Sequence, residues 1–247
     1  MGQVSEIWRH PIKSHGREKL TRVLLSAGQT MPWDRVWAVA HEASKADNTA
    51  WAPCVNFTIG AKAPALMAIT AQVDEATAIV TLAHPDLPDL VFSPDDDPMA
   101  LITWSKQLVP TNRAASSNIV RLENRGMTDT EFPSLSIGNL ASHRAIETAM
   151  GAPLSNHRWR TNIWLDGLEP WVEFDWIGRD IRIGNTEFSV RDRVKRCLAT
   201  TANPDTGLRD ADTLKTLQDT WGHTDHCVYA EVTKSGQIAT GDKIEVL

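Results

Sequence analysis

Cys197 is the side chain whose surroundings in the sequence best suit reactive chemistry. Three cations, Arg193, Lys195 and Arg196, precede it, and a polar Thr-Thr-Ala-Asn segment follows shortly after. Adjacent positive charge favours the thiolate form of a cysteine, which is both a nucleophile and a ligand for soft metals. The segment therefore predicts a reactive sulfur, whereas most lone cysteines in cytosolic proteins are inert core residues.

The other two cysteines, Cys54 and Cys227, are interpreted as structural. Cys54 lies in a Trp-Ala-Pro-Cys-Val-Asn segment, and Cys227 opens an apolar strand. Three widely spaced cysteines provide neither the close pairs of a zinc site nor the four thiolates of an iron–sulfur centre. The low number of cysteines and a polar start without a signal peptide indicate a reducing cytoplasm.

Two short clusters in the first part of the chain could bind an anion. In Arg9-His-Pro-Ile-Lys-Ser14, Lys13 and Ser14 follow a strand in a turn, and their charge and hydroxyl suit a phosphate. Arg35 follows Asp34 just before another strand. Each cluster also has an ordinary explanation, because turn lysines are usually solvated and an Arg beside an Asp often forms a local ion pair.

A third cluster is Asn156-His-Arg-Trp-Arg-Thr-Asn162, which leads into an apolar strand. If the segment is itself extended, Arg158 and Arg160 point the same way and could bind an anion. The alternative is a polar strand edge. His223, Asp225 and His226 could ligate a metal in principle, but they are interpreted as part of a polar loop.

Composition excludes several function classes. A formal net charge of -6 argues against binding nucleic acid by bulk electrostatics, so a bound anion needs a local group of cations. No apolar run approaches the roughly 20 residues that cross a bilayer. The sequence has no GxSxG, HExxH, Walker or GxGxxG motif. With 42% hydrophobic residues in 247, the chain can bury one large core or two small ones.

The elements that must position these residues are mostly short strands. Strands are expected at residues 4–8, 36–41, 65–73, 78–82 and 118–122, with hairpins at 181–190 and 227–246. Residues 86–98 read as a solvated loop. Helices are expected at 98–108, 139–150 and 212–221 because turn and capping residues bound them. Many short strands with few helices predict a closed or nearly closed β-barrel, with Cys197 at its rim.

Taken together and in this order, the clusters resemble those of the MOSC family. Within that family, their pattern is most similar to that of the mitochondrial amidoxime reducing components and their bacterial counterparts. Residues 1–112 resemble the family's N-terminal β-barrel domain, and residues 113–247 resemble the MOSC domain. The likeness lies in Trp8-Arg-His-Pro-Ile-Lys-Ser14, Asp34-Arg-Val-Trp37, Arg160-Thr-Asn162, Asp166-Gly-Leu-Glu-Pro-Trp171, Arg196-Cys197, Thr200-Thr201, Asn203-Pro-Asp-Thr-Gly207 and Gly241-Asp242. It implies a mainly β fold with a few helices.

The resemblance implies that Cys197 ligates the metal of the molybdenum cofactor, Mo-molybdopterin, and acts at the catalytic centre. It implies that cations and polar groups hold the pterin and its phosphate. The matching residues are Lys13, Ser14, Arg35, Ser134, Arg160, Asn162, Arg196 and Thr200. This chain departs from the family at Glu131-Phe-Pro-Ser134, where relatives often carry Asp-x-Ser-Pro. It departs again at Lys195, where some relatives have a small hydroxyl residue.

Three functions are compatible with these residues. The favoured one is a molybdenum-dependent oxidoreductase that reduces small N-hydroxylated compounds. Some relatives carry a ferredoxin domain that this chain lacks, so electrons are expected from a separate protein. The second is a carrier that delivers the cofactor or sulfur through Cys197. The third is a barrel that binds an acidic small molecule or partner without a cofactor.

Overall fold

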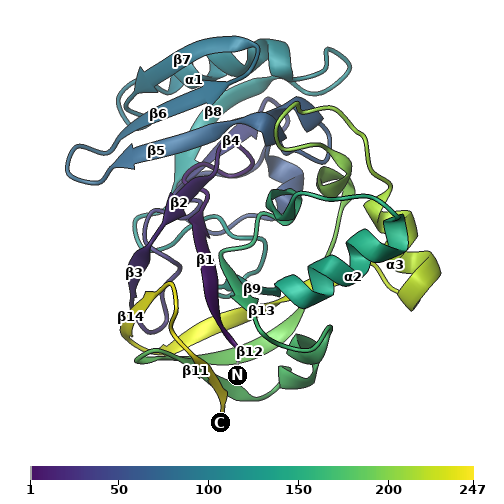
Figure 1. Ribbon diagram of the computed structural model, residues 1–247. Helices are drawn as coiled ribbons and strands as arrows, with labels where there is room; N and C mark the ends of the chain where they lie inside the picture. The colour runs from purple at the N-terminus through teal and green to yellow at the C-terminus, as the bar shows by residue number, and fades with distance from the viewer. Residues whose placement is uncertain (1) are drawn as a thin grey trace.

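The computed structural model describes residues 2–247, and its larger part is one eight-stranded sheet (Figure 1). The spatial order of the strands is β15-β11-β12-β13-β9-β10-β1-β2. The strands are β1 (Gln3–Arg9), β2 (Glu18–Leu20), β9 (Leu135–Asn139), β10 (Ile163–Asp166), β11 (Asp180–Ile183), β12 (Thr186–Lys195), β13 (Asp225–Lys234) and β15 (Ile244–Val246). All neighbours are antiparallel except β9 and β10.

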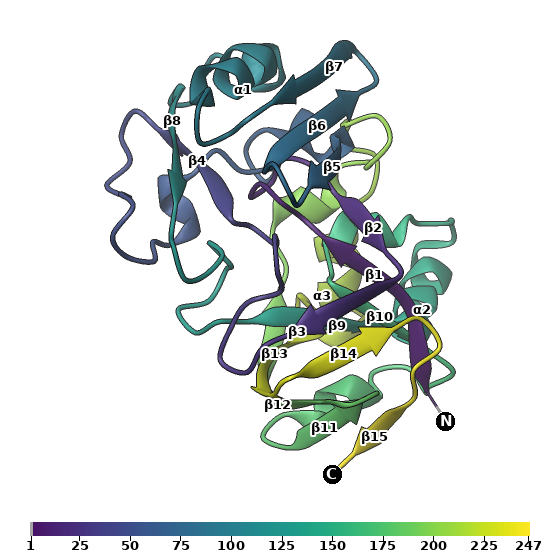
Figure 2. The same cartoon turned by 90° about the vertical axis from the view of Figure 1, so that its left-hand side faces the viewer.

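The sheet curls so that its two ends approach each other. The Val4 amide donates to the Asp242 carbonyl at 2.8 Å, and the Gly241 amide donates to the Val4 carbonyl at 2.8 Å. These bonds join β1 to the segment that leads into β15. A separate pair, β3 (Arg22–Leu25) and β14 (Gly236–Ala239), lies beside the sheet (Figure 2). The mainly β fold with a few helices is confirmed.

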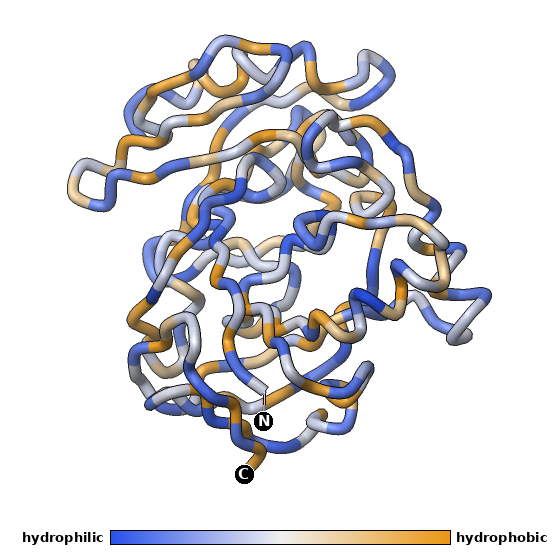
Figure 3. The backbone as a smooth tube through the Cα atoms, in the orientation of Figure 1, coloured by the Kyte–Doolittle hydropathy of each residue, from blue (hydrophilic) through white to orange (hydrophobic). Residues whose placement is uncertain are grey.

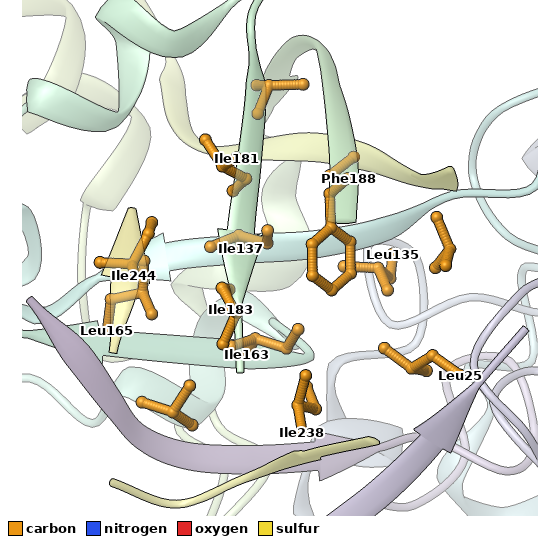
Figure 4. Close-up of a cluster of buried hydrophobic side chains, with 14 of the residues drawn as sticks. Leu25, Leu135, Ile137, Ile163, Leu165, Ile181, Ile183, Phe188, Ile238 and Ile244 are labelled. Atoms are coloured by element: carbon orange, nitrogen blue, oxygen red, sulfur yellow. The ribbon is translucent and has the colours of Figure 1, made fainter. Parts of the chain in front are cut away.

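Alternating residues of these strands fill the interior of the curled sheet. Ile181, Ile183, Thr186, Phe188 and Val190 are fully buried, while Arg182, Glu187 and Ser189 are only partly buried. Figure 4 shows Ile181, Ile183 and Phe188 in this core. This period of two places every second side chain on the inner face. Hydrophobic and hydrophilic residues are interleaved along the backbone in the same way (Figure 3). The hairpin predicted at residues 181–190 is confirmed, with its turn at Gly184.

The upper part of the molecule holds a second core (Figure 1). Its elements are the three-stranded sheet β5 (Thr70–Asp74), β6 (Ile79–His84) and β7 (Leu87–Phe92), the pair β4 (Trp37–His41) and β8 (Ser116–Arg121), and helix α1 (Pro98–Ser105). The Asp97 side chain accepts a hydrogen bond from the Ala100 amide at 3.2 Å, which satisfies a free N–H of the first turn. The helix predicted at residues 98–108 is confirmed, with its last turn as a 3-10 helix.

Two further helices, α2 (Leu140–Met150) and α3 (Thr213–Trp221), lie beside each other. Asn139 caps the start of α2, and both helices end at glycines in the left-handed region, Gly151 and Gly222. Both predictions are confirmed. The short 3-10 helices are Cys54–Asn56, Pro64–Ala68, Lys106–Leu108, Asn156–Trp159, Val172–Trp176 and Leu198–Thr201.

Three predictions of secondary structure outside the candidate site were wrong. The strand expected at residues 65–73 begins only at Thr70, because Pro64 starts a 3-10 helix. The loop expected at 86–98 contains β7, whose Pro88 is tolerated because β7 is an edge strand. The final hairpin does not form, because β14 pairs with β3 and thereby buries Ile238 against the main core.

Strands pair across the boundary predicted between residues 112 and 113. From the first half, β1 lies between β10 and β2 in the large sheet, and β3 pairs with β14. From the second half, β8 pairs with β4. The two halves therefore share a long seam, and the division at residue 112 stays a prediction. No helix within residues 2–247 is long and apolar enough to span a membrane.

Candidate functional site

A cavity with a free volume of about 110 Å³ lies at the seam between the two halves. Its walls carry an unusual share of cations for a protein of negative net charge. The residues that line it include Lys13, Ser14, Arg35, Arg158, Arg160, Lys195, Arg196, Cys197 and Thr200. The structure thus brings together four clusters that are far apart in the sequence.

Lys13 is held in the cavity wall by the backbone of β4. Its amide donates to the Trp37 carbonyl at 2.8 Å, and its side chain is buried. The Nζ atom donates to the Met127 carbonyl at 2.8 Å and pairs with the Asp129 carboxylate at 2.5 Å. Lys13 is therefore not a solvated turn lysine, and part of its charge is already compensated.

Arg35 forms an ion pair with the buried carboxylate of Asp34 and donates from Nη2 to the Arg160 carbonyl at 3.1 Å. Asp34 also accepts a hydrogen bond from the His10 amide at 2.7 Å. Burial opposes ionisation of Asp34, but the adjacent Arg35 charge and the His10 bonds outweigh it and hold the pKa of that carboxyl well below its usual range. The local ion pair proposed from the sequence is present, and Arg35 also reaches the cavity.

Arg160 is a cation without an ion-pair partner among residues 2–247. It ends the 3-10 helix Asn156–Trp159, so the strand expected for this segment was wrong and the side chains of Arg158 and Arg160 are not related by strand alternation. Its Nη2 donates only to the Gly16 carbonyl, at 3.1 Å. Burial and the neighbouring Arg35 charge lower the pKa of Arg160 to about 9. An anion bound next to this guanidinium would compensate its charge.

The backbone of the cavity wall is strained at three of these residues. Ser14, Arg35 and Arg160 have φ angles of 64°, 54° and 50°, in the left-handed region that favours glycine. Each such residue costs on the order of 1–3 kcal/mol, and such residues persist where the surrounding structure enforces them. They concentrate at functional sites, and here all three line one cavity.

Cys197 lies at the end of β12 and is exposed at the cavity. Its carbonyl accepts hydrogen bonds from the Thr200 amide at 3.2 Å and the Thr200 hydroxyl at 3.1 Å, so the following 3-10 turn holds it in place. Next to it, Arg196 donates to the carbonyls of His226 and Trp159, both at 2.8 Å. The thiol is thus accessible while the backbone on either side of it is fixed.

Two predicted residues, Ser134 and Asn162, do not line this cavity. They border a much smaller hollow beside it, and their polar groups bond within the protein. The Asn162 amide accepts from the Ser136 amide and hydroxyl and donates to the Trp8 carbonyl at 3.2 Å. The Ser134 hydroxyl lies 2.6 Å from that of Thr130. Their contact with a cofactor therefore stays a prediction.

Sequence reasoning missed several residues of the wall, among them Cys54, Asp129 and Tyr229. The Cys54 sulfur lies 3.1 Å from the Asp129 carboxylate, and burial together with that charge raises the pKa of Cys54 to about 11. Cys54 therefore stays a thiol. Tyr229 could have been found from strand alternation between buried Val228 and Ala230, whereas nothing in the sequence marks Asp129.

The histidines that could have ligated a metal form no such site. His226 is buried at the start of β13 and not in a polar loop, and its ring packs against Trp159 at 4.4 Å between centroids. Within residues 2–247, no three His, Cys, Asp or Glu side chains are placed to hold a metal ion together. The chemistry that remains is an anion site with one accessible sulfur.

Two family models match the chain. The MOSC N-terminal beta barrel domain matches residues 1–120, and the MOSC domain matches residues 132–245. Among solved structures, the YuaD protein from Bacillus subtilis is 13% identical over 100% of this chain and 96% of that chain, with a TM-score of 0.48. YiiM from Geobacillus stearothermophilus is 20% identical over 46% and 53%, with a TM-score of 0.36. No curated protein matches the sequence.

Proposed function

The chain belongs to the MOSC family, and from this premise we propose that it binds the molybdenum cofactor and reduces N-hydroxylated compounds. MOSC domains are associated with binding of this cofactor. The observation that carries the proposal is the cavity at the seam, where accessible Cys197 and several cations line the same walls. A soft thiolate suits molybdenum, and fixed cations suit the phosphate of the pterin.

The residues of the wall fit the cofactor in their chemistry. Cys197 would hold the metal, and Lys13, Ser14, Arg35 and Arg160 would hold the phosphate. Arg160 supports this assignment most, because its buried charge has no anionic partner among the described residues.

The cofactor, when bound, supplies a metal that exchanges two electrons. The net reaction consumes two electrons and two protons, breaks the N–O bond, and releases the amine or amidine and water. The chain's own residues would hold the pterin, and two of them, Lys13 and Arg35, are buried in the cavity wall. The electrons come from a separate redox protein, which is part of the proposal.

The activity is tested with protein produced in a host that makes the cofactor. Reduced methyl viologen serves as the electron source and benzamidoxime as the substrate. Benzamidine is expected from the wild type, and the Cys197→Ser variant is expected to form none above the rate without protein. Molybdenum-loaded wild type that leaves benzamidoxime unchanged would contradict the reductase proposal.

A carrier of cofactor or sulfur is the second candidate, and the exposure of Cys197 supports it. A sulfur at the surface can be handed to another protein, and its neighbour Leu198 is 53% exposed. A persulfide on Cys197 detected by mass spectrometry, together with release of cofactor to an apoenzyme, would favour delivery. A reductase shows neither and turns over repeatedly.

A further inference from the structure

Exposed apolar side chains lie beside Cys197 at the mouth of the cavity. Leu198 follows Cys197 directly and is 53% exposed, and Leu208 is 69% exposed. The Arg209 guanidinium donates to the Leu198 carbonyl and, at 2.7 Å, to the carbonyl of Ala61, which lines the cavity. Arg209 therefore ties the segment that carries Leu208 to the turn after Cys197, and both leucines stand in solvent near the accessible sulfur.

A third exposed apolar side chain, Val55, extends this surface onto the first half of the chain. Val55 is 65% exposed and follows Cys54, which lines the cavity. Val55 and Lys62 line one hollow, and Lys62 follows Ala61 in the sequence. We call the whole region the mouth surface and define it by Val55, Lys62, Lys195, Leu198, Leu208 and Arg209.

The exposed charges of the mouth surface are positive. Lys62, Lys195 and Arg209 are exposed, and none of them has an ion-pair partner among residues 2–247, although Asp225 lies opposite Lys195 on β13. The carboxylates of adjoining segments pair with cations that are buried or half-buried. These pairs are Asp129 with Lys13, Asp205 with Arg17 and Asp210 with Arg158. The mouth surface therefore carries unpaired positive charge on a chain whose formal net charge is -6.

We propose that the mouth surface docks the electron donor, and that this donor is an acidic protein that carries one electron at a time. The inference rests on the proposed function for the need of a donor. Opposite charges steer the encounter of two proteins, and a few apolar side chains form the centre of the small interfaces of redox pairs. Because electron transfer slows steeply with distance, docking beside Cys197 favours it. Two reduced donors are oxidised for each N–O bond broken, and solvent supplies the two protons.

Direct binding tests the docking surface without any turnover. An oxidised, acidic plant-type [2Fe–2S] ferredoxin is titrated calorimetrically into the molybdenum-loaded full chain at low ionic strength. Lys62→Glu and Leu208→Asp should each raise Kd about tenfold, whereas the matched controls Lys243→Glu and Leu24→Asp should change it less than twofold. Ferredoxin that does not bind wild type, or that loses as much affinity in the controls, would overturn the proposal.

The two controls carry the same changes at the opposite end of the large sheet. The Lys243 carbonyl accepts a hydrogen bond from the amide of Gly184, just before β12, whereas Lys195 ends that strand. The ten residues of β12 span about 30 Å. Leu24 is 65% exposed on β3, whose partner β14 packs against the start of β12. Neither control residue therefore belongs to the mouth surface.

Two electron sources separate this inference from the proposed activity. Reduced methyl viologen is a small cation that needs no docking surface, so all four variants should reduce benzamidoxime within twofold of the wild-type rate. With reduced ferredoxin, Lys62→Glu and Leu208→Asp should lower kcat/KM for ferredoxin about tenfold. Raising the ionic strength from about 0.01 M to about 0.15 M should have a similar effect on wild type.

The outcomes are distinguishable. If neither donor supports turnover but ferredoxin binding still depends on Lys62 and Leu208, the docking surface stands and the reductase proposal fails. The docking proposal is overturned if methyl viologen supports turnover and ferredoxin does not. It is also overturned if a basic cytochrome c binds as tightly as ferredoxin, or if light scattering shows a dimer of this chain that Leu208→Asp dissociates.

Discussion

The interior of the curled sheet and the cavity at the seam differ in the side chains they contain and in their backbone conformation. Inside the sheet, Ile137, Ile183 and Phe188 are fully buried among other apolar side chains, on regular strands. In the cavity, Arg35 is buried with its charge and Arg160 is half-buried, both on left-handed backbone. Burial of apolar side chains in the first region stabilises the folded state. Charged side chains and left-handed backbone in the second region destabilise it. The contrast indicates that the apolar interior of the curled sheet stabilises the fold enough to offset the cost of the charged groups at the seam.

The largest expected effect comes from a change inside the sheet. Phe188→Ala should lower the free energy of unfolding by about 3–5 kcal/mol, because a buried aromatic ring is replaced by a cavity. Denaturant unfolding measures the change, and molybdenum per folded chain should stay at the wild-type level. A loss of molybdenum in folded Phe188→Ala protein would show that cofactor binding depends on the packing inside the sheet.

A smaller effect concerns pH and His15, which is fully buried beside Ser14. Burial lowers the pKa of His15 to about 4, whereas an unfolded histidine titrates near 6.5. Below pH 6.5 the unfolded chain takes up a proton that the folded chain does not, so stability is lost as the pH falls from about 6.5 to about 4. The loss assigned to His15 is about 2–3 kcal/mol.

The test for His15 is denaturant unfolding at pH 7 and pH 4.5. The free energy of unfolding should fall less in His15→Gln than in wild type. Buried His10 and His226, whose pKa values are also lowered by burial, contribute equally to both proteins and cancel in the difference. Parallel losses in the two proteins would show that the surroundings of His15 do not oppose protonation.

The smallest effect compares two left-handed residues, Ser14 in the cavity and Ala78 between β5 and β6. Glycine adopts this conformation without a steric penalty, so Ser14→Gly and Ala78→Gly should each gain about 0.5–1 kcal/mol of stability. Only Ser14→Gly should also lower molybdenum occupancy, since it removes a hydroxyl from the cavity. Equal molybdenum occupancy in both variants would show that the Ser14 hydroxyl does not contribute to cofactor binding.

The sequence predicted the two regions unequally, for a physical reason. Strand alternation at residues 181–190 and the caps Asn139 and Gly151 are local signals, so the hairpin and α2 could be predicted directly. Lys13, Arg35 and Arg160 each have an ordinary local explanation, and only the resemblance to a family joined them. The left-handed backbone of Arg35 and Arg160 is stabilised by contacts distant in sequence, such as the bond from Arg35 to the Arg160 carbonyl.

The most direct measurement of the central claim is the molybdenum content of purified protein from a cofactor-producing host. Elemental analysis should give a molybdenum-to-chain ratio approaching one for wild type and for Cys54→Ser, whose thiol lines the same cavity. The ratio for Cys197→Ser should fall at least tenfold at unchanged stability, because the metal loses its protein ligand. Wild type without molybdenum, or Cys197→Ser that retains as much as wild type, would contradict the account.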